Sequence, residues 1–274
     1  MRLSDIQEYF LNLTSADNFE AIKLQADGVI QAGDPADAED FLNLLSKSLA
    51  AQGNTVQSSN PQMYDQYEAM WTLLAFKAFP TLNSDDQENL LKTRFFFAIQ
   101  NGFNPDAIVN EYFLDYQDDS VVKNKFGIFI KYLLSNAERL GSNTVEIEGK
   151  KYLPELRYWI QDYSKFPSKT PKRGSVERLA YINQSGNVRS LTQVYRQALL
   201  KVLKFYDDLV NVDRPRKMID EEDLEDARED MEVLAKAWQE AQGGNVPSMP
   251  QAPNQQVGLN IDQKLRDLRN RVGR

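Results

Sequence analysis

The stretch SLTQVYRQALLKVLKFYDDLV, residues 190–210, decides the fold class of this 274-residue chain. Its apolar residues recur every three or four positions, which is typical of an amphipathic helix with one face toward a core. Ser190 and Gln193 have the spacing of a capping box at its start, and Pro215 follows its end. The apolar stripe comprises Leu191, Val194, Tyr195, Ala198, Leu199, Val202, Leu203, Tyr206, Leu209 and Val210.

Similar helix signals recur through the first 140 residues. Capping pairs stand at Asp17–Glu20, Asp34–Pro35, Ser84–Gln87 and Asn104–Pro105. The segment MWTLLAFKAF, residues 70–79, is apolar nearly all round, which is typical of a central helix packed on several sides. These features predict a succession of helices.

The predicted loops between these helices are short. They carry Gly, Asn or Pro at Gly33, Gly53–Asn54, Phe79–Pro80, Asn101–Gly102 and Gly141. Short loops favour antiparallel neighbours, and no fixed-period repeat is present. The sequence therefore predicts an all-α fold, an irregular array of antiparallel helix hairpins.

Residues 144–152, TVEIEGKKY, depart from the helical pattern. Their alternating character, with Gly149 at a turn position, predicts one small β-hairpin near 145–152. Helix signals resume at 153–160, and a loop is predicted over 165–174 before the long helix.

The sequence predicts five parts. They are an acidic helical array (1–143), a basic helical part with the hairpin, packed on the first (144–217), an acidic helix (218–242), a flexible Pro/Gln-rich linker (243–258) and an amphipathic C-terminal peptide that forms a short helix (259–274).

Composition excludes several kinds of chemistry. The chain has no cysteine and no histidine, so thiol nucleophiles, imidazole bases and thiolate or imidazole metal sites are absent. No apolar run is long enough to span a membrane, and the N-terminus lacks a signal-peptide core. We expect a cytoplasmic protein without a cofactor or resident metal.

A magnesium-dependent helical enzyme is one alternative. Glu222 and Glu225 fall within an E-x-x-E-D pattern that resembles half of the metal motif of all-α nucleotide pyrophosphatases, but the second half-motif is missing downstream. Asp207–Asp208 resembles part of the D-D-x-x-D motif of prenyl-transferring helical enzymes, but Asn211 replaces the last acid. N-terminal helix capping and the edge of a core stripe explain these acids without a metal.

Charge is distributed unevenly along the chain. Residues 1–120 carry 6 basic and 19 acidic side chains, whereas residues 121–218 carry 19 basic and 9 acidic ones. The two parts either neutralise one another inside the fold or present surfaces of opposite sign to partners.

The basic part contains a candidate nucleic-acid site. Its cations alternate with aromatic residues, and cations suit phosphates while aromatic rings suit base stacking. The candidate cations are Lys150, Lys151, Arg157, Lys165, Lys169, Lys172, Arg173 and Arg178. Core packing of the aromatic residues is the competing interpretation.

The C-terminal peptide is a candidate docking element. Apolar anchors at Ile261, Leu265, Leu268 and Val272 share one helical face, with Arg266, Arg269 and Arg271 among the surrounding cations. The peptide either packs on its own domain, lies on an anionic membrane surface or binds a groove of a protein partner.

The leading hypothesis is a non-enzymatic interaction or scaffold protein. It docks a protein partner through residues 259–274 and through its charged surfaces, and the preceding linker favours this interpretation. Nucleic-acid binding through residues 150–178 is the first alternative, and the magnesium-dependent enzyme is the second.

Overall fold

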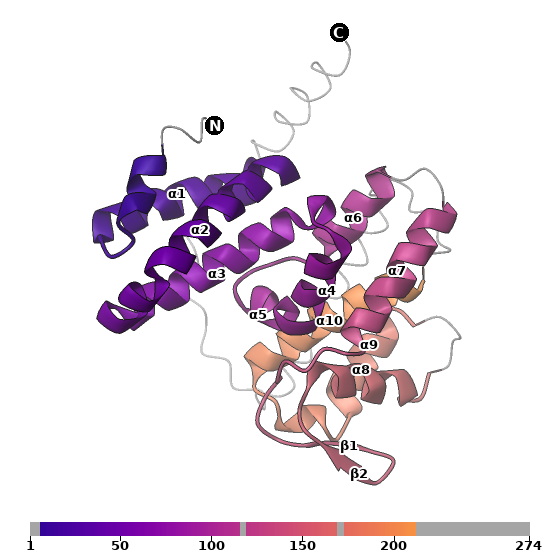
Figure 1. Ribbon diagram of the computed structural model, residues 1–274. Helices are drawn as coiled ribbons and strands as arrows, with labels where there is room; N and C mark the ends of the chain where they lie inside the picture. The colour runs from indigo at the N-terminus through magenta and orange to yellow at the C-terminus, as the bar shows by residue number, and fades with distance from the viewer. Residues whose placement is uncertain (1–5, 116–118, 169–172, 212–274) are drawn as a thin grey trace, which may run out of the picture. The chain divides into compact units, whose positions relative to one another are not determined.

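The fold is known from a computed structural model that describes residues 6–115, 119–168 and 173–211 (Figure 1). These residues form ten α-helices and one two-stranded sheet, which confirms the predicted all-α class with a small hairpin. They belong to a compact unit, Met1–Arg216. The predicted acidic helix, linker and C-terminal peptide lie outside the described residues.

The N-terminal helices form one packed group. They are η2 (Gln7–Leu11), α1 (Ala16–Ala32), α2 (Pro35–Ser59) and α3 (Pro61–Lys77). As predicted, Asp34 caps α2 by accepting a hydrogen bond from the Asp37 amide at 2.8 Å, with Pro35 in the first turn. Asp17 is not the cap of α1; Ser15 holds that position and accepts from the Asn18 amide.

The loop predicted at Gly53–Asn54 is wrong, because α2 continues through it to Ser59. Gly53 is buried against α3, and an added Cβ would lie 3.4 Å from the ring of Tyr64. Glycine therefore allows close helix packing here instead of a turn. The chain turns at Asn60, where Pro61 starts the next helix.

The middle helices pack around a core of aromatic side chains. The middle helices are η3 (Phe79–Thr81), α4 (Ser84–Thr93), α5 (Phe95–Gln100), α6 (Asp106–Asp115) and α7 (Asp119–Leu133). Ring contacts at centroid distances of 4.6 to 6.5 Å connect Phe76, Phe79, Phe103, Tyr112, Phe126 and Phe129. The Glu138 carboxylate accepts from the amides of Phe96 and Phe97 at the start of α5.

The hairpin is formed by β1 (Val145–Ile147) and β2 (Lys150–Tyr152), with Val145 opposite Tyr152. Its turn residues, Glu148 and Gly149, both have positive φ, at 51° and 78°. Two successive positive φ angles are what a tight two-residue hairpin turn requires.

The last described elements are α8 (Leu156–Lys165), α9 (Ser175–Gln184), η4 (Val188–Ser190) and α10 (Gln193–Val210). Helix α10 contacts α5, α6 and α7 as well as α8 and α9 (Figure 1). The predicted stripe needs three corrections. Val194 is 67% exposed and Val210 is also exposed, whereas Asp207 faces the core. Thr192, not Ser190, caps this helix.

Candidate functional site: the charged surfaces and the buried polar network

The candidate basic segment is divided between the surface and the interior. Lys150 and Lys151 are exposed on β2, and Lys151 lies opposite Glu146 across the hairpin. Lys165, at the end of α8, pairs with Glu148 at 2.8 Å. Lys169 and Lys172 lie outside the described residues.

Arg178 is an internal residue. It projects from α9 and its Nη1 donates to Oδ2 of Asp207 on α10 at 2.9 Å, with only 11% of the arginine side chain exposed. The Tyr163 hydroxyl of α8 donates to the same oxygen at 2.7 Å. These two contacts join three helices, so Arg178 is engaged within the fold.

Burial changes the pKa values of Asp207 and Tyr163. It raises the pKa of the Asp207 carboxyl above its usual range, and the hydrogen bonds from Tyr163 and Arg178 offset only part of that effect. The pKa of Tyr163 is raised by burial first and by the nearby Asp207 charge second. The tyrosine therefore acts as a hydrogen-bond donor to a buried carboxylate.

Arg173 is also used inside the fold. Its Nη2 donates to the carbonyl oxygens of Ser164 and Phe166, at 2.9 and 2.5 Å. Its guanidinium lies 4.7 Å from the ring centroid of Tyr163, a cation–π contact. Together, Arg173 and Arg178 bind to this protein's own groups instead of forming a free basic surface.

A second carboxylate connects α8, α9 and the hairpin. Oδ2 of Asp162 accepts from the Tyr181 hydroxyl at 2.8 Å and from the Asn187 amide at 2.9 Å. Asn187 also donates to the Glu146 carbonyl and accepts from the Glu146 amide. Local sequence patterns do not predict this network, because its members are 19 to 41 positions apart in the chain.

Two of the aromatic residues form a partly exposed group beside the hairpin. The rings of Tyr152 and Tyr158 stack at 4.5 Å, and the Arg157 guanidinium lies 4.9 Å from the Tyr158 ring. Arg157 also pairs with Glu155 at 2.5 Å. Trp159 and Tyr163, in contrast, are fully buried, so their aromatic rings belong to the core.

The outward face of α1 combines acids with an exposed leucine. Asp17, Glu20, Leu24 and Asp27 follow helical spacing, opposite the buried residues of the same helix. We call these four residues the acidic leucine face. Leu24 is 71% exposed, and none of the three acids pairs with a cation in the described part of the chain.

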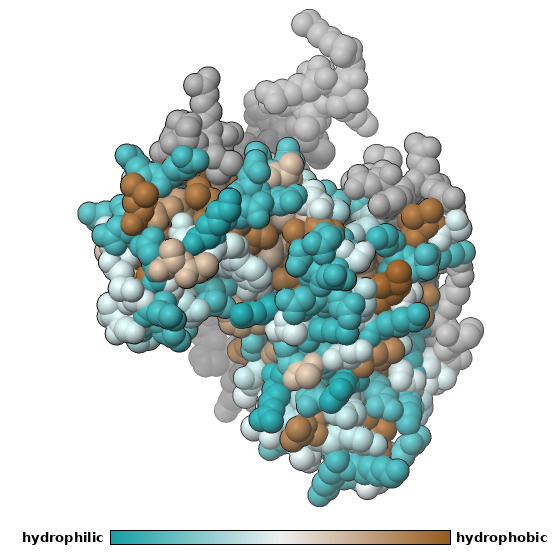
Figure 2. Space-filling model, in the orientation of Figure 1, coloured by the Kyte–Doolittle hydropathy of each residue, from teal (hydrophilic) through white to brown (hydrophobic). Residues whose placement is uncertain are grey.

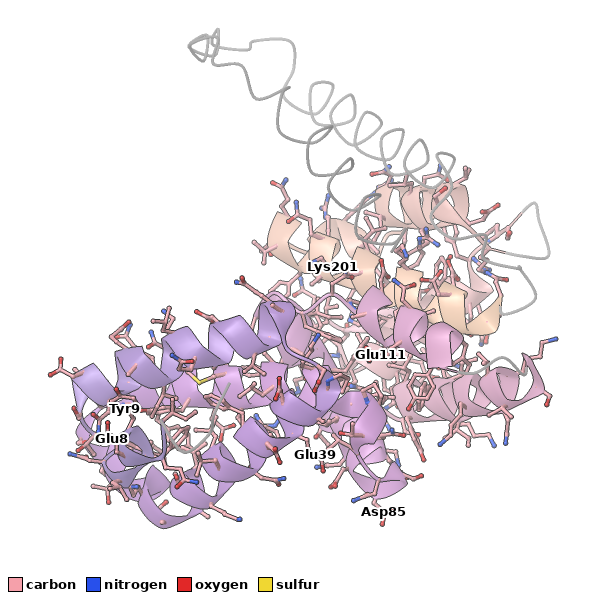
Figure 3. All side chains as sticks on the ribbon, turned by 90° about the horizontal axis from the view of Figure 1, so that it is seen from above. Glu8, Tyr9, Glu39, Asp85, Glu111 and Lys201 are labelled. Atoms are coloured by element: carbon pink, nitrogen blue, oxygen red, sulfur yellow. The ribbon has the colours of Figure 1, made fainter. Side chains whose placement is uncertain are left out.

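The acidic character extends over the N-terminal helices. In Figure 3, Glu8 lies on η2 and Glu39 on α2, both in this group, whereas Asp85 lies on α4 and Lys201 on α10. Figure 2 shows isolated hydrophobic groups among the hydrophilic ones over the same helices. The counts of charged residues predicted the excess of acids in this part of the chain. They did not predict the acidic leucine face, although the helical spacing of its acids around Leu24 could have indicated it.

The remaining candidate residues have different outcomes. The anchors and cations of residues 259–274, and Glu222 and Glu225, lie outside the described residues, so their roles stay predictions. Asp207 is bound to Tyr163 and Arg178, and Asp208 pairs with Lys204 at 3.0 Å. In residues 6–115, 119–168 and 173–211, no three acids gather where they would hold a metal ion.

Two further observations bear on the class of protein. Among the described helices, none is long and apolar enough to cross a membrane. The chain matches no family model, no curated protein and no solved structure.

Proposed function

We propose that this chain is a non-enzymatic protein-interaction protein of the cytoplasm. It docks a protein partner through the basic C-terminal segment, residues 259–274, and through its charged surfaces. The observation that carries this proposal is the unneutralised acidic surface of α1. Lys204 of the basic part does pair with Asp106 of the acidic part at 3.0 Å. Asp17, Glu20 and Asp27, however, are exposed and form no ion pair with any residue that the structure describes.

The use of cations inside the fold favours a protein partner over a nucleic acid. Arg173 and Arg178 are bound to groups of this chain, and Lys165 and Arg157 have carboxylate partners. A phosphate backbone would have to displace these contacts. The arrangement that favours nucleic acid is smaller: Lys150 and Lys151 beside the Tyr152–Tyr158 stack.

A capture experiment tests the proposed function. Full-length protein is compared with the double variant Leu265→Asp, Leu268→Asp, with nuclease present and absent. We expect the wild type to capture a partner in the presence of nuclease, because the apolar anchors drive docking, and we expect the variant to lose it. The captured protein is then purified and its direct binding is measured by calorimetry.

The matched control is Gln263→Asp, Asn270→Asp, which adds the same charge at non-anchor positions of the same segment. It should retain most of the binding. Equal direct binding by the anchor variant would contradict docking through the C-terminal segment. Binding that disappears with nuclease would favour the basic, aromatic surface near the hairpin.

A further inference from the structure

Helix α1 presents an outer face that the rest of the described fold does not cover. Its inner side buries Phe19, Ile22, Ala26 and Val29 in the core. Its outer side exposes the acidic leucine face, where a leucine stands within one helical turn of two carboxylates. Lys23 is the one cation of α1, and it lies to the side of this face.

The chemistry of the face specifies its partner. An exposed leucine flanked by acids complements a helix that alternates apolar anchors with cations. Residues 259–274 have that composition, with four anchors and five cations, which are Lys264, Arg266, Arg269, Arg271 and Arg274. Opposite charge steers the two surfaces together, and burial of leucine side chains supplies affinity.

We infer that the acidic leucine face binds the C-terminal segment of a second copy of this chain. This inference rests on the proposed function, because it uses residues 259–274 as a docking element and names a receptor for them. Each chain carries both halves of the contact. Reciprocal exchange closes a dimer, whereas one-way docking builds longer assemblies.

Sedimentation velocity of the full chain over a range of concentrations tests the inference. The face variant Glu20→Lys, Asp27→Lys and the anchor variant Leu265→Asp, Leu268→Asp each remove one half of the contact. We expect the wild type to self-associate and each variant to associate at least roughly tenfold more weakly. The changed α1 side chains are exposed, so circular dichroism should show an unchanged fold.

Mixing the two variants makes the test specific. The face variant retains an intact C-terminal segment and the anchor variant retains an intact face, so their mixture should form a heterodimer although each alone associates only weakly. The control Asp40→Lys, Asp65→Lys changes the same charge at exposed positions of α2 and α3 and should associate like the wild type. About 0.5 M salt should weaken all association, because it screens exposed charges.

Two results would overturn the inference. One is a wild type that stays monomeric at all concentrations, and the other is a mixture of variants that forms no heterodimer. Either result leaves the proposed function standing if the anchor variant still loses its purified partner. Loss of self-association in the face variant, with no effect in the anchor variant, would contradict the assignment of residues 259–274 as the ligand.

Discussion

At position 207 a carboxylate lies inside the helical core, where Tyr163 and Arg178 donate to one of its oxygens. An ion pair ordinarily lowers the pKa of an acid, but burial outweighs the pair here and raises that of Asp207. The folded protein therefore holds this proton more tightly than the unfolded chain. The contribution of Asp207 to stability is largest below the unfolded pKa and declines as pH rises through the folded pKa.

Replacing Arg178 with methionine should make this dependence visible. The variant leaves Asp207 buried without its cation, which raises the pKa of the acid further. We expect a loss of about 3–5 kcal/mol in the free energy of unfolding near neutral pH, because an uncompensated buried charge is costly. Near pH 4 the acid accepts a proton more readily, so the loss should shrink. Urea unfolding at a series of pH values measures the difference from wild type.

The control for this prediction is Arg94→Met. Arg94 pairs with Glu68 at 2.9 Å but is 38% exposed, so its removal should cost less than about 1 kcal/mol. A loss in Arg178→Met that is equally large at every pH would show that lost packing, and not the charge of Asp207, accounts for the change.

At the scale of single elements, α10 was predictable and α9 was not. Helix α10 buries Ala198, Leu199, Val202, Leu203 and Leu209 at the helical spacing that the sequence predicted, and that periodicity is local information. Helix α9 buries only Tyr181 and Ile182. It is held by Arg178–Asp207 and Tyr181–Asp162 contacts, whose partners are distant in sequence. The available local signal was Glu177, which accepts from the Gly174 amide at the helix start.

The stability of the β1–β2 hairpin should depend on Asn187, although this residue lies outside both strands. The Asn187 side chain bonds to both backbone groups of Glu146 and to Asp162. In Asn187→Ala we expect faster amide hydrogen exchange at Glu146, because that amide loses its acceptor. Amides in the middle of α10 should keep their protection. Exchange detected by NMR resolves the two sites.

Asn183→Ala is the matched control, since Asn183 is exposed on α9 and its side chain makes no hydrogen bond within the described residues. It should leave the exchange at Glu146 unchanged. Equal protection of Glu146 in wild type and Asn187→Ala would mean that strand pairing alone holds the hairpin.

For the whole molecule, charge counts predicted an acidic and a basic part but not how each charge is used. Arg173 and Arg178 are not surface cations, because the tertiary fold places Arg178 beside Asp207 and Arg173 beside the carbonyl groups of Ser164 and Phe166. The acids of α1 are the opposite case: in the part of the chain that the structure describes, Asp17, Glu20 and Asp27 form no ion pair. The candidate nucleic-acid surface is therefore smaller than its sequence predicts, and the acidic surface is preserved.

Helix α10 also determines how the compact unit should unfold. It contacts α5 and α6 of the acidic part and α8 and α9 of the basic part, so we expect the two parts to unfold together. Trp71 in α3 and Trp159 in α8 report on the two parts separately, and Trp159 is fully buried. In a Trp238→Phe background, where these two are the remaining tryptophans, Trp159→Phe should destabilise the chain by roughly 1–3 kcal/mol.

That destabilisation should lower the urea midpoint reported by Trp71 fluorescence, although Trp71 lies in the other part. Within this variant, the fluorescence midpoint should coincide with the midpoint from far-ultraviolet circular dichroism, because a cooperative unit has one transition. The reciprocal variant Trp71→Phe checks the coupling from the other side. A Trp71 transition that ignores the change at Trp159 would show that the acidic helices unfold independently of α8, and that α10 does not couple them.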